Sequence, residues 1–350
     1  MSTAPGHGTE FGSALEFATV SSVVSPRPQV SRTITATCAS LLRQVYRATH
    51  RRDQWHSERL WPHTRISRDA DGRLEEMRFG RRQMRIANHS GSDALKLSLG
   101  NAVVHLIASG PSISDIDYSA LRLGNVLGVN GAIALASRHS VKFTHYCITD
   151  TGFLRNRPDL VATILSQDLL LFTTPVALTH ILHHFPYDKI RCRFFLLERV
   201  GEQALRPREP AESAITHANG NLTLFDSTYG LGFSHDIRRG IFPGGTVAYE
   251  ALQILSWLGF RQIYLHGIDL SNADHAPRFY ENEENKLPCH LTKQLERVIK
   301  PSFRQASQIL REKSISVTNL SQRSALTNDI FPIVDWRSLI QNRDGADRAS

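Results

Sequence analysis

From residue 102 onward, short apolar runs alternate with stretches of helical periodicity. This order of strand, helix and strand is typical of an α/β fold, because parallel strands are joined by crossovers that are usually helices. We therefore predict a mostly parallel sheet with flanking helices. The expected strands are Ala102–Ile107, Val126–Val129, Phe143–Ile148, Leu169–Thr173, Arg193–Leu197, Gln262–Leu265 and Ser316–Thr318.

One helix is particularly well marked between Thr246 and Leu258. Its apolar residues recur at intervals of three and four, which predicts an amphipathic helix that Gly259 ends. The preceding segment, from Glu202 to Gly240, is less regular, and we expect it to form loop-rich cover over the sheet.

The rest of the chain divides by composition. Residues 1–35 are rich in Ser, Thr, Pro and Gly, which predicts a disordered tail. Residues 36–100 form a basic N-terminal extension that we expect to be helical or irregular, with a basic amphipathic helix from Ala36 to about Arg59. Residues 101–330 would form the main domain, and residues 331–350 a C-terminal tail.

Composition limits the classes of function. The four cysteines are far apart, which predicts neither a zinc site nor a disulfide framework and favours a reducing cytoplasm. No apolar run reaches about 18 residues, so we expect a soluble chain. The net charge of +8 fits an anionic substrate, an anionic membrane surface or nucleic acid. No RNA- or DNA-binding motif accompanies that charge, so nucleic acid is not expected as a partner.

Polar and glycine residues follow the first three expected strands. Because the carboxyl ends of parallel strands meet at one edge, these residues are candidates for a nucleotide site. A plain turn, or helix capping by Asn130, is the alternative interpretation. The candidates are Ser109, Gly110, Pro111, Ser112, Asn130 and Asp150.

Two further clusters are expected at the same edge. Gly244, Gly245 and Thr246 open the well-marked helix, whose N-terminus would suit a phosphate, although Thr246 would also serve as a simple cap. Gly267 and Asp269 follow the strand Gln262–Leu265 in the stretch HGIDLS. Gly267 would allow close approach of a ligand, and Asp269 would hold a sugar or order a lid.

Asp115 and Asp117 form a DxD pair, a spacing that can hold a metal ion. It lies in SISDIDYSAL, where acidic residues commonly begin a helix, and not at the end of an apolar strand. We therefore predict no metal and no cofactor.

The polar segment of about residues 271–292 has the character of a lid over substrate. It contains His275 and His290, either of which could serve as a general base, and Tyr280.

Three stretches together resemble a known family: ASGPSISDIDYSAL, GVNGA, and GGTVAYEALQILSWLGFRQIYLHGIDLS. They are similar to the bacterial CMP-sugar transferases, namely the sialyltransferases of glycosyltransferase family 42, the transferases that add a third Kdo to the lipopolysaccharide core, and proteins with an MptE-like domain. The resemblance spans about residues 102–326.

The resemblance implies a Rossmann-like sheet, a CMP-activated keto-acid sugar as donor, inversion at the anomeric carbon and no metal. It implies that the loop from Ser109 to Ser112 and Asn130 hold the cytidine nucleotide, that His290 is the base with His275 as rival, and that Tyr280 bonds the departing phosphate. This chain has Ala108-Ser109-Gly110 where the family often has Gly-Asn-Gly, and Ser271 where the sialyltransferases have a tyrosine.

The leading hypothesis is therefore a transferase that moves Kdo, or a sialic or other nonulosonic acid, from CMP to a lipopolysaccharide core or related glycan. Such an enzyme would work at the inner face of the cytoplasmic membrane, where the basic extension would favour anionic lipid. The alternative is an MptE-like pterin pyrophosphokinase, which would need ATP and Mg²⁺. A basic nucleic-acid binder is the third hypothesis.

Overall fold

The computed structural model describes residues 32–80, 82–85, 92–99, 102–271, 276–289 and 291–340. Its centre is a seven-stranded sheet of order β12-β11-β4-β5-β6-β7-β8, in which every neighbouring pair is parallel. All of the strands expected from residue 102 onward are present, with ends shifted by no more than two residues. They are β4 (Val103–Ile107), β5 (Asn125–Val129), β6 (His145–Ile148), β7 (Leu170–Thr173), β8 (Arg193–Leu196), β11 (Gln262–His266) and β12 (Ser316–Asn319).

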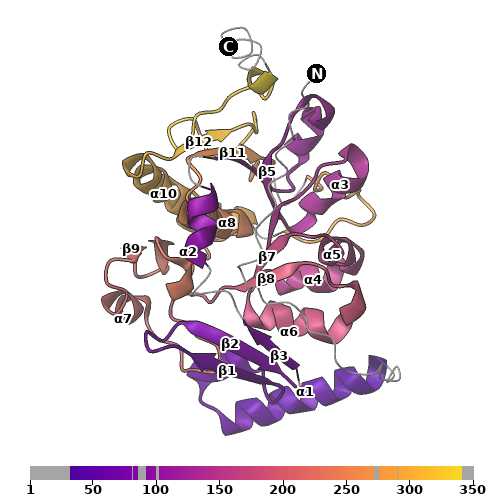
Figure 1. The fold of residues 1–350 in the computed structure, drawn as a ribbon, viewed down its shortest axis with the longest axis vertical. Coiled ribbons are helices and arrows are strands. Elements are labelled where there is room, and N and C mark those ends of the chain that lie inside the picture. The colour runs from indigo at the N-terminus through magenta and orange to yellow at the C-terminus, as the bar shows by residue number, and fades with distance from the viewer. Residues whose placement is uncertain are drawn as a thin grey trace, which may run out of the picture.

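Helices cover both faces of this sheet (Figure 1). Alternate strand residues point to opposite faces, so Leu106 enters one hydrophobic core and Ile107 the other. The first core is built with α2 (Ser92–Leu99), α8 (Val247–Leu258) and α10 (Lys300–Glu312), the last preceded by α9 (Leu291–Gln294). The second is built with α3 (Ala134–His139), α4 (Thr151–Asn156), α5 (Pro158–Leu165) and α6 (Pro175–His184).

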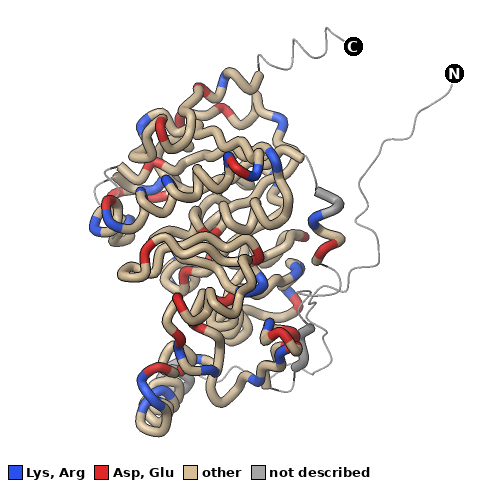
Figure 2. Tube along the Cα trace, turned by 90° about the vertical axis from the view of Figure 1, so that its left-hand side faces the viewer, with Lys and Arg blue, Asp and Glu red and all other residues tan. Residues whose placement is uncertain are grey.

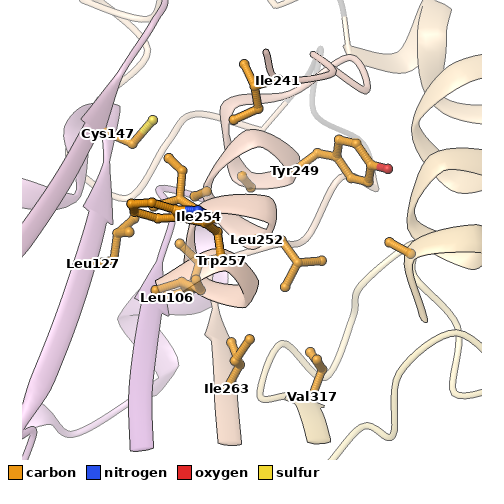
Figure 3. Close-up of a cluster of buried hydrophobic side chains, with 14 of the residues drawn as sticks. Leu106, Leu127, Cys147, Ile241, Tyr249, Leu252, Ile254, Trp257, Ile263 and Val317 are labelled. Carbon is orange, nitrogen blue, oxygen red and sulfur yellow. The ribbon is translucent and has the colours of Figure 1, made fainter. Parts of the chain in front are cut away.

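Helix α8 differs from the expected amphipathic helix, because it is buried almost all round. Only Val247 and Ser256 among its residues are not buried. Figure 3 shows Ile254 and Trp257 close to the β4–β5 side and Leu252 toward Val317. The cause is that α10 and a hairpin of β9 (Leu222–Asp226) and β10 (Leu231–Ser234) cover the side that an isolated helix would expose. The predicted caps are confirmed: Thr246 accepts from the Ala248 N–H, and Gly259 has a φ of +93°.

The N-terminal extension contains a sheet that the sequence analysis did not anticipate. Helix α1 (Arg32–Thr49) confirms a basic helix, but it ends ten residues before Arg59. An antiparallel three-stranded sheet follows, made of β1 (Thr64–Arg68), β2 (Leu74–Phe79) and β3 (Arg82–Arg85). Leu74 and Met77 of β2 join the second core, so this sheet is packed onto the main domain and is not irregular. Figure 2 shows several Lys and Arg positions on α1 and beside it, at the foot of the molecule.

The segment expected to be loop-rich carries α7 (Ala211–Thr216) and a hairpin of β9 (Leu222–Asp226) and β10 (Leu231–Ser234). Of the tail expected at 1–35, residues 1–31 lie outside the described residues, and residues 32–35 begin α1 and are therefore helical. No helix in the described ranges is long and apolar enough to cross a membrane.

Candidate active site

A cavity of about 810 Å³ opens at the carboxyl edge of the sheet. It lies beside the switch point of the fold, because the chain leaves β4 toward β5 on one side and leaves β11 toward β12 on the other. The volume is of the size that holds a nucleotide or drug-sized ligand. Most of the residues expected at the site line this one cavity: Ser109, Gly110, Pro111, Asn130, Asp150, Gly244, Gly245, Thr246, Gly267 and Asp269.

At the β4–β11 end of the cavity, two loops touch through their backbones. The Gly110 N–H donates to the Gly267 carbonyl at 2.9 Å. A Cβ on Gly110 would lie 2.6 Å from that same oxygen and 2.1 Å from Asp269 Oδ2, and Gly267 has a φ of +66°. The two loops can approach this closely because Gly110 has no side chain. A larger side chain at Gly110 is therefore expected to disturb the contact between the two loops as well as the approach of a nucleotide.

Asp269 connects these loops. Its Oδ2 accepts from the Ser112 N–H at 3.0 Å, and burial raises the pKa of its carboxyl. Ser112 itself is buried, donates its hydroxyl to Ser321 at 3.1 Å, and does not line the cavity. Ser112 was predicted to bind the nucleotide, but its side chain lies beneath the cavity surface.

Two buried acceptor atoms at the cavity, Asp269 Oδ1 and Asn130 Oδ1, have no hydrogen-bond partner among the residues that the structure describes. Asn130 has a φ of +47°, and its carbonyl is fixed by the Tyr146 hydroxyl at 2.6 Å. Buried polar atoms in native proteins are nearly always paired with protein or ordered water, so these two atoms are available to accept hydrogen bonds from water or from a ligand. The sugar hydroxyls and the amino group of a nucleotide are donors of this kind.

The start of α8 forms the wall opposite these acceptors. Gly244 and Gly245 have φ values of +49° and +78°, and Thr246 caps the helix. A Cβ on Gly244 would lie 2.1 Å from the Tyr249 ring, so a side chain is excluded there. A backbone turn of this shape brings the helix N-terminus to the cavity, where its partial positive charge favours an anion.

A charged cluster that the sequence analysis did not single out lies at the β6–β8 end. Thr149, Arg199 and Glu250 all line the cavity. The Thr149 hydroxyl donates to Glu250, and Arg199 Nη2 lies 4.0 Å from Glu250 Oε1. Burial raises the pKa of Glu250 to about 7, an effect that Arg199 and the Thr149 hydrogen bond partly offset. Glu250 lies within an otherwise apolar stretch of α8. Its charge at such a position is the one sequence signal that could have identified it as a site residue.

The described part of the expected lid, residues 276–289, lies against the cavity. The side chain of Glu281 is buried and accepts from Arg278 Nη1 at 3.0 Å and from Arg157 Nη2 at 2.7 Å. Arg157 Nη2 also donates to the Asn285 carbonyl at 2.6 Å. These bonds join the segment to the loop between α4 and α5 and hold it over the sheet edge. Arg278 and Glu281 line the cavity as well.

The expected catalytic side chains are not brought together by the described residues. His275 and His290 both lie outside them. Tyr280 is described but does not line the cavity; its ring packs against Gly131, where a Cβ would lie 1.8 Å from the ring, and burial raises its pKa to about 12.

The histidine of HGIDLS has a structural role. His266 is fully buried, with Nε2 at 2.9 Å from His105 Nδ1 and Nδ1 at 3.3 Å from the Tyr118 hydroxyl. Burial and His105 lower its pKa well below the usual value, so it is neutral. It lies behind the cavity wall.

The DxD aspartates point to separate local contacts. Asp117 caps the short 3-10 helix Tyr118–Ala120, and Asp115 pairs with Arg323 at 3.0 Å. Neither lines the cavity. Across the described ranges, no three His, Cys, Asp or Glu side chains are placed to hold a metal ion. The prediction that no metal is needed stays a prediction.

Comparisons with known proteins point to glycosyltransferases. A family model described as the 3-deoxy-D-manno-octulosonic acid (Kdo) transferase WaaZ matches residues 226–337. The chain is 26% identical over 256 residues to a probable 3-deoxy-manno-octulosonic acid transferase of Escherichia coli. The matched region covers 67% of this chain and 83% of that protein. The chain is thus similar to Kdo transferases in sequence.

Solved structures with a related fold are more distant. The sialyltransferase CstII from Campylobacter jejuni, in complex with cytidine-5'-monophosphate, is 15% identical, with a TM-score of 0.38 over 66% of this chain and 84% of that one. The MAf glycosyltransferase from Magnetospirillum magneticum is 14% identical, with a TM-score of 0.41 over 72% of this chain. The present chain spans 37% of that second protein.

Proposed function

We propose that the chain is a glycosyltransferase that moves a keto-acid sugar, Kdo in first place, from its CMP-activated form to a lipopolysaccharide core or related glycan. The observation that carries this is the overlap between the cavity and the segment similar to Kdo transferases. Residues 226–337 supply the α8 N-terminus, Gly267, Asp269 and the lid side of the cavity. A sialic or other nonulosonic acid as donor would fit the same chemistry.

The proposed placement puts the nucleotide across Ser109–Gly110, Asn130 and the start of α8. The unpartnered oxygens of Asn130 and Asp269 would accept from nucleotide or sugar donors. The helix N-terminus would stabilise the negative charge that the departing CMP phosphate gains, which is the task a metal performs in other transferases. Retention of turnover in excess EDTA is the expected result, and loss that Mg²⁺ restores would contradict it.

The general base that we propose is His290, with His275 as the rival. A neutral imidazole that removes the acceptor's hydroxyl proton typically contributes roughly 10²- to 10⁴-fold to the rate. His290→Ala should therefore lower kcat by about that factor at saturating donor, and His275→Ala is its matched control. Near-normal turnover of His290→Ala with loss in His275→Ala would assign the base to His275.

Nucleotide choice tests the proposal directly. Thermal shift with CMP or CTP should raise the Tm of the wild-type chain, and ATP with Mg²⁺ should raise it less. The reverse order would favour the pterin pyrophosphokinase, an alternative that draws no support from the matches above. Asn130→Ala should weaken CMP binding, whereas Asn125→Ala, at the other end of β5, serves as the control.

We propose peripheral attachment to the inner membrane face through the basic region from Arg43 to Arg85. Charge screening shortens the field to about 8 Å at physiological salt, so co-sedimentation with anionic vesicles should fall steeply as salt rises. Leu41 and Val45 on α1 are 60% and 41% exposed, and they are the apolar candidates if binding proves insensitive to salt.

A further inference from the structure

The β6–β8 end of the cavity carries a cation with unused donors. Arg199 follows β8 and lines the cavity, and its side chain is 44% exposed. Its one ion pair, with Glu250, is long at 4.0 Å, and its guanidinium makes no hydrogen bond within the described part of the chain. A guanidinium presents a planar fork of donors that matches a carboxylate, so this side chain is available for an anionic ligand.

Glu250 gives that end of the cavity a second, titratable group. Its side chain is only 3% exposed and takes a hydrogen bond from Thr149. The charged or titratable neighbours that act with it are Arg199, Asp150 and the Cys147 thiol. Burial brings the pKa of Glu250 to about 7, so both its protonated and its ionised forms exist near neutral pH. The protonated form can donate a hydrogen bond, and the ionised form repels anions.

We propose that Arg199, Thr149 and Glu250 form a subsite for the carboxylate of an acidic sugar. Arg199 provides the positive charge, and protonated Glu250 donates its O–H to the ligand or to Thr149, whose hydroxyl then turns to the ligand. An anion bound beside Glu250 favours the protonated form, because two like charges at close range disfavour ionisation. The subsite therefore accepts an acidic sugar and takes up a proton with it.

This inference rests on the proposed function, in which both the transferred sugar and the acceptor glycan carry a carboxylate. A Kdo or sialic acid donor has a carboxylate at its anomeric carbon, and an acceptor that already holds such sugars has one as well. The proposal concerns the shared carboxylate, and the experiment separates the two sources.

The decisive variant is Glu250→Gln, which keeps the shape and a hydrogen-bond donor but cannot ionise. Binding of CMP-Kdo or CMP-sialate by the wild type should weaken about tenfold between pH 6 and pH 8, since the protonated fraction of a group with a pKa near 7 falls by that factor. In Glu250→Gln the same titration should be flat across this range. Comparing one ligand in two variants cancels the titration of other groups.

Arg199→Gln tests the cation, with Arg206→Gln, an exposed arginine outside the cavity, as its matched control. Loss of a charged hydrogen-bond partner should weaken binding of the CMP-sugar by about tenfold or more while leaving affinity for CMP unchanged. Equal loss for CMP and the CMP-sugar would mean that Arg199 binds the phosphate, which overturns the subsite.

Which of the two carboxylates binds the subsite follows from which constant the substitutions change. A change in the Kd of the CMP-sugar assigns the donor, and a change confined to the KM of the acceptor assigns the acceptor; both support the subsite. Parallel pH curves for wild type and Glu250→Gln overturn it, as does a Glu250→Gln enzyme with unchanged affinities and lost kcat, which would make Glu250 a base.

Failure of the proposed function would be seen separately, as a wild-type chain that does not bind CMP at all. Free Kdo, titrated into wild type and Glu250→Gln at pH 6 and pH 8, then decides on the subsite. An affinity for free Kdo that falls from pH 6 to pH 8 only in the wild type supports the carboxylate subsite. The same pH dependence in both variants rejects the subsite.

Discussion

The two ends of the cavity are built by different means. At the β4–β11 end, the backbones of Gly110 and Gly267 touch and the Asp269 carboxylate spans the two loops. At the β6–β8 end, the surface is formed by the side chains of Thr149, Arg199 and Glu250, which are joined by one hydrogen bond and a long ion pair.

The first end of the cavity is therefore defined by the shape of the backbone, and the second end by the charge of its side chains. Backbone contact leaves no room for a side chain, so substitutions at the first end should affect folding together with any ligand binding there. Side chains at the second end can be exchanged without moving the backbone, so substitutions there should alter which ligand is accepted.

The largest expected effect is at Gly110. Gly110→Ala should lower the free energy of unfolding by about 3 kcal/mol, because its Cβ would collide with the Gly267 carbonyl oxygen and Asp269. Gly124→Ala, which has open space around its Cβ position and an ordinary φ, is the matched control. Chemical denaturation of both variants measures the difference. Equal stability of the two would show that the loops move apart easily, and the contrast between the ends would fail.

A smaller effect is expected from Glu250 as pH changes. Its pKa of about 7 in the folded chain lies above the ordinary value of 4.5, so the folded state holds more protons than the unfolded state between these values. Stability conferred by the protonated form is therefore lost as pH rises through this window, by on the order of 2 kcal/mol between pH 5 and pH 8. The difference in unfolding free energy between Glu250→Gln and wild type should grow over that range. A constant difference would contradict the buried, titrating carboxyl.

The smallest effect concerns the helix cap between the two ends. Thr246→Ala removes the acceptor for the Ala248 N–H and should cost about 1 kcal/mol. Thr246→Ser keeps the hydroxyl and should be close to wild type in the same denaturation experiment. If Thr246→Ala lowers CMP affinity and Thr246→Ser does not, the hydroxyl also contacts the ligand, which extends the side-chain end of the cavity toward α8.

Much of the candidate site was predictable because sheet geometry converts order along the chain into position. Gly110, Asn130 and Asp150 each follow a strand of one parallel sheet, so they had to meet at one edge. Their roles were not predictable in the same way. Whether a glycine faces a ligand or a neighbouring loop depends on residues 157 positions away, as the hydrogen bond from Ser112 to Asp269 illustrates.

Patterns in the sequence are enough to predict the seven strands of the central sheet, the helix that ends at Leu258 and the edge at which a ligand would lie, because periodicity and turn residues act over a few neighbours. Three features follow only from the tertiary structure: α8 is buried almost all round, β1–β3 pack as a sheet onto the second core, and the pKa of Glu250 is raised to about 7. Each of these depends on what distant segments place around a residue: the cover by α10, the apolar contacts of Leu74 and Met77, and the exclusion of water around one carboxyl. Burial is a property of the packed chain, and no local pattern encodes it.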